Sequence, residues 1–226
     1  MSSVLCAVRS GHKRGGGRML DRTLRRVIDP CLEPVAGLLQ RSGVQANWVT
    51  VLGFLLGLGG CAAIAAGHIW LGLVLILSNR LADGLDGMVA RRSGGAGLAA
   101  TGAGGGSDLG GFLDIVLDLL FYALVPLSFG LLNRERNLLP AAVLLVSFFG
   151  TSGSFLAYAV MMAKRGESGR EKSFFYSAGL MEGSETVLFF VAFCVFPGWF
   201  AELAWVFAGL CFLTTLQRLA AGLRSF

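Results

Sequence analysis

The sequence "WVTVLGFLLGLGGCAAIAAG", residues Trp48–Gly67, contains no charged side chain. A helix of about 20 apolar residues is long enough to cross the hydrocarbon core of a bilayer, so this stretch predicts a transmembrane helix. Further apolar stretches of similar length follow it, over residues 69–90, 110–132, 138–163, 178–197 and 199–220. We predict an all-α integral membrane protein, with six transmembrane helices in one domain over residues 44–226.

The composition of the whole chain agrees with a membrane protein. Hydrophobic residues make up 54% of the sequence and charged residues only 15%, and the mean hydropathy is +0.68. Soluble domains have about 25% charged residues. The five cysteines are scattered and form no CxxC pair, which argues against a disulfide framework and against a zinc site.

Two segments precede the first apolar stretch. Residues 1–20 are basic and rich in glycine, and they lack the apolar core and cleavage site of a signal peptide. We expect them to form a disordered arm that contacts anionic lipid headgroups and no nucleic acid. In residues 21–43, Leu24, Val27 and Ile28 share one helical side with arginines around it. This pattern predicts an amphipathic helix lying in the membrane interface.

The distribution of lysine and arginine predicts the orientation in the membrane. Basic residues concentrate in cytoplasmic loops. Six spans place most of them on the side of the N-terminus, namely the arm, Arg91 and Arg92, the segment 164–172, and Arg218 and Arg224 near the C-terminus. The opposite side holds only Arg134 and Arg136. We therefore expect both termini to be cytoplasmic, in the inner membrane if the source is a bacterium.

Four aspartates interrupt the apolar sequence near the cytoplasmic ends of the second and third predicted spans. Asp83 and Asp86 are three residues apart, and Asp114 and Asp118 are four apart, so each pair shares one face of its helix. A carboxylate inside a membrane is costly and therefore marks a functional site. Side-chain oxygens without His or Cys suit a hard divalent cation such as Mg²⁺ or Mn²⁺. Two such ions would form a clamp for phosphoryl transfer.

A structural alternative is that nearby arginines, such as Arg80 and Arg91, neutralise these carboxylates. For one isolated aspartate this is the better interpretation, because buried charges are usually paired. For four aspartates on paired helical faces we favour the metal site.

The aspartate motif resembles the signature of the CDP-alcohol phosphotransferases. "DGLDGMVAR", residues Asp83–Arg91, and "GGFLDIVLD", ending at Asp118, follow its pattern D-x-x-D-G-x-x-A-R, spacer, G-x-x-x-D-x-x-x-D. All fixed positions match: Asp83, Asp86, Gly87, Ala90, Arg91, Gly110, Asp114 and Asp118. The similarity extends to the six-helix layout and to "NWVT", Asn47–Thr50, at the start of the first span.

The resemblance implies an enzyme of phospholipid synthesis. Its donor is a CDP-linked alcohol such as CDP-diacylglycerol, an acceptor hydroxyl attacks the β-phosphorus, and CMP leaves. The implied ligands of two Mg²⁺ or Mn²⁺ ions are the four aspartates, and Asp118 is the implied general base. The implied nucleotide-binding residues are Gly87, Ala90, Arg91, Asp83 and Thr50. The resemblance also implies a homodimer.

Two other functions remain open from the residues alone. Intramembrane prenyltransferases also use aspartate-rich motifs and magnesium, but the glycine after Asp86 and the Ala90–Arg91 pair argue against that class. A cation carrier without catalytic activity would use the same four carboxylates. Nucleotide dependence separates these functions, because only the first requires CMP to bind.

The loop between the second and third spans, residues 92–109, is rich in glycine and longer than the family's usual spacer. "GAGLAA", Gly95–Ala100, imitates a dinucleotide-binding fingerprint, but no predicted strand precedes it. We predict a flexible spacer, since a longer loop costs little additional closure entropy. A lid over the site is the alternative.

A second group of polar residues is a candidate acceptor pocket. Glu182 and Glu185 begin the fifth predicted span, three residues apart, and Arg218 interrupts the last one. We expect them, with Lys164, to bind the acceptor alcohol or its phosphate. The alternative is that the glutamates only form ion pairs with basic residues at the interface.

Overall fold

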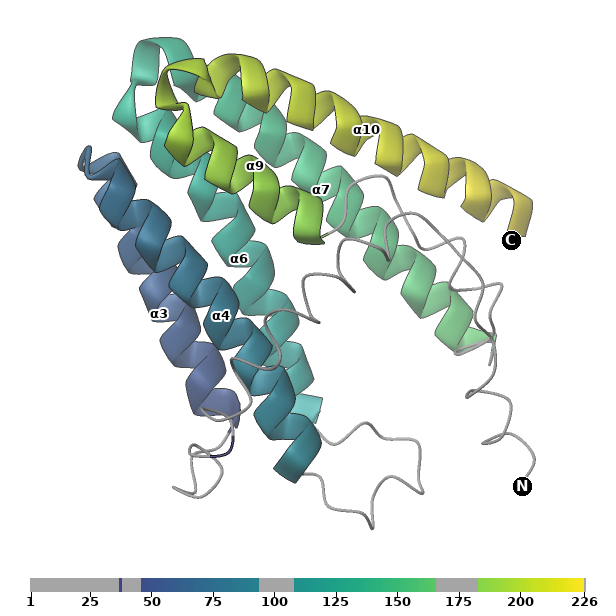
Figure 1. Ribbon diagram of the computed structural model, residues 1–226. Coiled ribbons are helices and arrows are strands. Elements are labelled where there is room, and N and C mark those ends of the chain that lie inside the picture. Colours follow the sequence, from purple (N-terminus) through teal and green to yellow (C-terminus); the bar gives the residue numbers. More distant parts are fainter. Residues whose placement is uncertain (1–36, 38–45, 94–107, 166–182, 226) are drawn as a thin grey trace.

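The computed structural model describes residues 46–93, 108–165 and 183–225, together with Gly37. These residues are helical, and no strand occurs among them. The elements, in chain order, are α3 (Ala46–Ala65), α4 (Ile69–Ser93), α6 (Asp108–Leu132), α7 (Arg134–Lys164), α9 (Gly183–Val195), the short 3-10 helix η2 (Pro197–Trp199) and α10 (Phe200–Ser225) (Figure 1). The predicted all-α class is confirmed.

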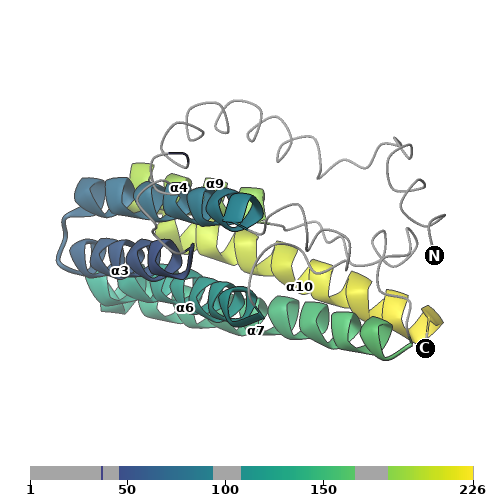
Figure 2. The ribbon, with the colours of Figure 1, turned by 90° about the horizontal axis from the view of Figure 1, so that it is seen from below.

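The long helices pack in a continuous series. α4 packs along α3, α3 contacts α6, α6 contacts α7, and α7 packs along α10. The shorter α9 touches both α4 and α10. α7 and α10 run side by side and extend past the end of α6 (Figures 1 and 2). The two helices that carry the aspartates, α4 and α6, both pack against α3.

The turn between α3 and α4 is closed by Gly67, whose φ is +89°. Its N–H donates to the carbonyl of Ile64 at 2.9 Å, and the N–H of His68 donates to the carbonyl of Ala63 at 2.8 Å. This pair of bonds is the Schellman ending of a helix, which favours glycine at the left-handed position. The reversal places α4 directly against α3.

Phenylalanines from three helices are the largest buried side chains of the core. Phe193 of α9 lies between Phe129 of α6 and Phe207 of α10, with ring centroids 5.8 and 6.4 Å away. Phe129 and Phe200 are stacked at 4.9 Å. Such ring pairs stabilise beyond the area they bury, so they fix α9 and α10 against α6.

The outer surface is apolar, as a lipid environment requires. Large hydrophobic side chains are exposed along the long helices, among them Phe149, which is 84% exposed. Four of the described helices are long and apolar enough to cross a membrane: Trp48–Ala65, Leu109–Leu132, Arg134–Met161 and Pro197–Arg224. This agrees with the predicted membrane class.

Two of the six predicted spans, over residues 69–90 and 178–197, are not among these four helices. α4 has 25 residues but carries the charged motif, and α9 has only 13. The structure describes the expected span over residues 178–197 only from Gly183 onward. The basic arm, nearly all of the interfacial helix and residues 94–107 of the glycine-rich loop lie outside the described residues.

Candidate functional site

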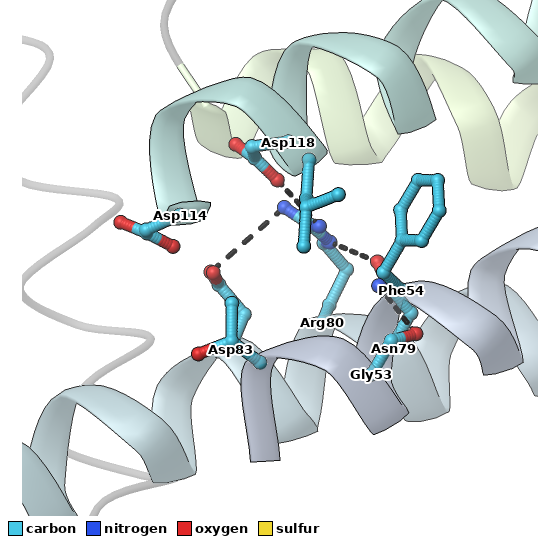
Figure 3. Close-up of a pocket in the computed structure, with 9 residues that line it drawn as sticks. Gly53, Phe54, Asn79, Arg80, Asp83, Asp114 and Asp118 are labelled. Atoms are coloured by element: carbon cyan, nitrogen blue, oxygen red, sulfur yellow. Dashed lines mark hydrogen bonds and ion pairs between the residues drawn. The ribbon is translucent and has the colours of Figure 1, made fainter. Parts of the chain in front are cut away.

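A pocket opens where α3, α4 and α6 meet, and it contains aspartates from both halves of the motif. Asp83 comes from α4, and Asp114 and Asp118 come from α6 (Figure 3). The remaining lining residues are Thr50, Gly53 and Phe54 of α3, Asn79 and Arg80 of α4, and Leu117 of α6. The fold thus brings together residues 31 to 35 positions apart in the sequence, as the paired spacings predicted.

Arg80 occupies the space between the two acidic helices. Its Nη2 lies 2.6 Å from Oδ1 of Asp118, and its Nη1 lies 3.8 Å from Oδ2 of Asp83. Nη1 also donates to the hydroxyl of Tyr122 at 3.2 Å. Its guanidinium carbon lies 4.6 Å from the centroid of the Phe121 ring. One cation thus connects α4 to α6 through charge, hydrogen bonding and ring contact.

Asn79 links this arginine to α3. Its Oδ1 accepts from Nε of Arg80 at 2.8 Å, and its Nδ2 donates to the carbonyl of Gly53, also at 2.8 Å. A Cβ atom at Gly53 would lie 2.9 Å from Cβ of Ala82, so only glycine allows α3 and α4 to approach this closely. The small residue permits the contact that holds Asn79 and, through it, Arg80.

The donor atoms fit a hard divalent cation in their chemistry. The acidic side chains that line the pocket offer only carboxylate oxygens, which Mg²⁺ and Mn²⁺ prefer. In addition, Oδ1 of Asp118 is buried, and no donor among the described residues meets hydrogen-bond geometry toward it. A buried carboxylate oxygen without a donor requires a cation, and the described side chain of Arg80 places one 2.6 Å away.

The described side chains do not by themselves form a closed metal cluster. Among them, no three His, Cys, Asp or Glu residues lie close enough together to hold an ion. Asp86, Gly87, Ala90 and Arg91 belong to the helical backbone of α4, but their side chains are outside the described set. Asp86 follows Asp83 by three residues, just under one turn along the helical backbone of α4.

Arg80, one of the two arginines named in the structural alternative, contacts two of the four aspartates. From the sequence alone, Arg80 is only a possible partner of the aspartates, and Asn79 and Tyr122 have no predicted role. Signals for all three were present. Asn79 and Arg80 are polar residues inside an apolar helix, and Tyr122 follows Asp118 by four residues, on the same helical face.

The three candidate acceptor residues that the structure describes do not line this pocket. Arg218 is buried between α10 and α7, where its Nη1 donates to the carbonyl of Thr151 at 2.8 Å and its guanidinium carbon lies 5.3 Å from the Phe155 ring. Lys164 is exposed at the end of α7. Glu185, in the first turn of α9, accepts from Oγ of Ser184 at 3.0 Å. Glu182 lies outside the described residues.

Comparison with known proteins gives several matches. A family model described as CDP-alcohol phosphatidyltransferase matches residues 44–217. The inner membrane protein YnjF of Escherichia coli is 44% identical over 207 residues, which cover 90% of this chain and 95% of that protein. The archaetidylinositol phosphate synthase of Methanothermobacter thermautotrophicus is 34% identical over 97 residues, covering 43% of this chain and 41% of that protein.

One solved structure shares the fold. It is the phosphatidylinositol phosphate synthase of Mycobacterium tuberculosis in complex with manganese and citrate. The TM-score is 0.62 at 22% identity, and the match covers 84% of this chain and 87% of that one. At this identity the likeness concerns the arrangement of helices.

Proposed function

Because this chain belongs to the CDP-alcohol phosphatidyltransferase family, we propose that its reaction takes place in the pocket between α3, α4 and α6. The chain is a transferase of phospholipid synthesis, which moves a substituted phosphoryl group from a CDP-linked alcohol to an acceptor hydroxyl and releases CMP. Family membership decides against the prenyltransferase and the cation carrier. One observation carries the proposal: Asp83, Asp114 and Asp118, from both halves of the motif, line one pocket.

Asp83, Asp86, Asp114 and Asp118 are the proposed ligands of two Mg²⁺ or Mn²⁺ ions. Such ions, when bound, neutralise the negative charge of the donor's phosphates. The manganese in the Mycobacterium tuberculosis structure supports a divalent metal in this fold. The chain's own contribution is to hold carboxylates from α4 and α6 in place before the donor arrives, which reduces the reorganisation needed for the reaction.

Asp118 is the proposed general base. Its side chain lines the pocket and is partly exposed, and Arg80 contacts its Oδ1 atom. In this role, the carboxylate accepts the proton of the acceptor hydroxyl as the oxygen attacks the β-phosphorus. The bond from that phosphorus to the CMP oxygen breaks, and CMP leaves with the bonding electron pair.

The proposed nucleotide site extends along α4 from the same pocket. Thr50 and Asp83 both line the pocket, which supports their place in it. Gly87, Ala90 and Arg91 continue from Asp83 along the helix at spacings of four, seven and eight residues, so they lie near the same face. Arg91 supplies a positive charge at the end of this row for a phosphate of the donor.

The acceptor pocket is proposed at Glu182, Glu185, Arg218 and Lys164, apart from the aspartates. Arg218 supports it, because a buried arginine in a membrane span marks a functional site by default. The acceptor then approaches from the side of α7, α9 and α10. The archaetidylinositol phosphate synthase among the relatives makes inositol phosphate the first acceptor to test.

We also propose an inner-membrane protein with both termini and the pocket on the cytoplasmic side, and a homodimer. The E. coli relative is named an inner membrane protein, which supports the first proposal. Light scattering of the purified protein in detergent tests the second.

An acceptor screen tests the proposed function. Purified protein is mixed with CDP-diacylglycerol, Mn²⁺ and one candidate acceptor at a time, and CMP release is measured. Inositol phosphate, glycerol phosphate, serine and choline are the first acceptors. We expect release that depends on both the metal and one acceptor, and CMP should inhibit it.

A further inference from the structure

We propose that Arg80 is the resident counter-ion of the carboxylate site, and that its guanidinium and a divalent cation compete for the same atom, Oδ1 of Asp118. The inference rests on the proposed function, because it takes Asp83 and Asp118 to be metal ligands. It assigns to this chain a positioning residue outside the aspartate motif. The observations that carry it are the contacts of Arg80, its burial and the geometry of Asp118.

The guanidinium of Arg80 is held by Asn79 of its own helix and by two aromatic rings of α6. Nε donates to Oδ1 of Asn79 at 2.8 Å, and Nη1 donates to the hydroxyl of Tyr122 at 3.2 Å. The ring centroids of Phe121 and Tyr122 lie 4.6 and 5.2 Å from its central carbon. Nη2 is thereby directed at Asp118 (Figure 3). Because these contacts already fix the planar guanidinium, it loses little conformational entropy when it binds a carboxylate.

The support for Arg80 is itself fixed. Asn79 is 4% exposed and bonds to the carbonyl of Gly53, so it cannot turn away without breaking a buried hydrogen bond. The side chain of Arg80 is only 14% exposed. These features distinguish the ion pair between Arg80 and Asp118 from a surface salt bridge, which contributes little to stability and has a variable geometry.

The charge of the site explains why a resident cation is useful. Asp83, Asp114 and Asp118 line one pocket, and carboxylates gathered in this way repel one another even though Asp83 and Asp114 are partly open to solvent. Arg80 contacts one carboxylate on each helix and thus offsets the repulsion between α4 and α6. Removing one partner of a buried ion pair is strongly destabilising, so Arg80 stabilises the site when metal is absent.

The same contact must weaken metal binding. Oδ1 of Asp118 is buried and lies 2.6 Å from Nη2, a separation that leaves no room for a metal ion between the two atoms. A cation that binds this oxygen must first separate it from the guanidinium. Metal affinity is therefore lower than the four carboxylates alone would give, and removing Arg80 should raise it.

The test is Mn²⁺ binding by isothermal titration calorimetry, with the full chain in detergent and no donor present. Arg80→Met removes the charge and keeps an apolar stem of similar length. We expect Mn²⁺ to bind on the order of tenfold more tightly, because the variant lacks the ion pair that competes for Oδ1 of Asp118. Unchanged or weaker binding would contradict the proposal.

A matched control separates local competition from a change in net charge. Arg136 forms an ion pair with Glu202 of the same length, 2.6 Å, at the other end of the bundle. Arg136→Met removes the same charge there and should leave Mn²⁺ affinity unchanged. An equal gain of affinity in both variants would show that only the net charge matters, and would overturn the proposal.

A second background separates competition for Asp118 from simple repulsion between Arg80 and the metal. In the Asp118→Asn chain, the oxygen for which the two cations compete has lost its charge. If Arg80 competes for Asp118, adding Arg80→Met to this chain should change Mn²⁺ affinity by less than twofold. If Arg80 only repels the metal ion, the same substitution should still raise the affinity about tenfold. A full gain in this background contradicts competition at Asp118.

Stability gives a readout that does not require activity. Metal-free Arg80→Met should melt at a lower temperature than the parent, and Mn²⁺ should raise its melting temperature by more. If this variant does not fold, Arg80→Lys retains a charge but cannot bond Asn79, Tyr122 and Asp118 together, and it should bind Mn²⁺ more tightly than the parent. Equal or weaker binding by Arg80→Lys contradicts the proposal.

The proposed metal site has its own test in the same titration. Asp83→Asn should weaken Mn²⁺ binding whether or not Arg80 competes. If Asp83→Asn binds as the parent does, the metal site itself is wrong. If Asp83→Asn binds Mn²⁺ weakly but Arg80→Met binds it no more tightly than the parent, only the proposed role of Arg80 is wrong.

Discussion

Nη2 of Arg80 lies 2.6 Å from Oδ1 of Asp118 and joins the two helices, α4 and α6, that carry the two halves of the aspartate motif. The arginine precedes Asp83 by three residues, and Tyr122 follows Asp118 by four, so the contacts repeat the helical spacing of the motif itself. The site therefore depends on how α4 and α6 are held against α3, and changes in this packing should affect its chemistry.

Gly57 should be essential for this packing. A Cβ atom there would lie 2.7 Å from Cδ2 of Phe121 and 3.2 Å from Cγ of Asn79. Gly57→Ala should lower the free energy of unfolding by about 1–3 kcal/mol, the usual cost of overpacking. It should also reduce CMP release, because Phe121 and Asn79 both contact Arg80. Thermal melting in detergent and initial rates measure the two effects.

Gly59 provides the matched control in the same helix. A Cβ atom there meets only Cδ1 of Leu75, at 3.8 Å. Gly59→Ala should therefore leave activity unchanged and raise the melting temperature, since alanine favours a helix by up to about 1 kcal/mol over glycine. Equal losses in both variants would show that the close approach at Gly57 is not the cause.

Asp118→Asn should separate catalysis from donor binding. If Asp118 is the base, the amide cannot accept the proton, and turnover should fall by at least about 100-fold. The KM for CDP-diacylglycerol should change less than it does in Asp83→Asn, whose side chain is proposed to bind both metal and nucleotide. Equal changes of KM in the two variants would argue that Asp118 acts only as a ligand.

Arg218→Lys should act on the acceptor. Lysine retains the charge but cannot reproduce the planar fork that reaches Thr151 and stacks on Phe155. We expect a higher KM for the acceptor with an unchanged KM for the donor, measured by CMP release at varied concentrations of each. A lower melting temperature with both KM values unchanged would assign Arg218 a structural role.

The orientation in the membrane can be measured by cysteine accessibility. A single cysteine placed after Arg224 should be labelled from the cytoplasmic side, and one placed at Arg134 from the opposite side. The physical reason is the concentration of basic residues on the side of the termini. The reverse labelling would place the aspartate pocket at the wrong face for a donor made in the cytoplasm.

Much of the fold was accessible from the sequence because it depends on local pattern. The apolar stretches predicted α3, α6, α7 and α10 within a few residues at most ends, since helix length in a membrane is set by the bilayer. The start of α7 was placed at residue 138 but lies at Arg134, where Asn133 accepts from the N–H of Arg136 and caps the helix. A side-chain cap allows a helix to begin with polar residues. A prediction from hydrophobicity alone leaves such residues out of the helix.

The site was predictable only in part, because its completion depends on contacts between helices. The spacing of Asp83, Asp114 and Asp118 indicated a shared pocket, and they line one. The bond from Asn79 to the carbonyl of Gly53 joins residues 26 positions apart, and no periodicity encodes it. Nor does the sequence show that Arg80 is directed at Asp118 rather than at solvent, because the rings of Phe121 and Tyr122, on another helix, hold its guanidinium in place.

The central claim is that the aspartates of α4 and α6 form the metal-dependent transfer site. The most direct measurement is CMP release from CDP-diacylglycerol by the parent, Asp114→Asn and Glu135→Gln, each with Mn²⁺ and the acceptor found in the screen. Glu135 is an exposed carboxylate in the first turn of α7, remote from the pocket. We predict that Glu135→Gln retains full activity and that Asp114→Asn loses at least about 100-fold, the upper end of the loss seen when only the support of a metal ligand is removed. Full activity in a folded Asp114→Asn chain would contradict the account.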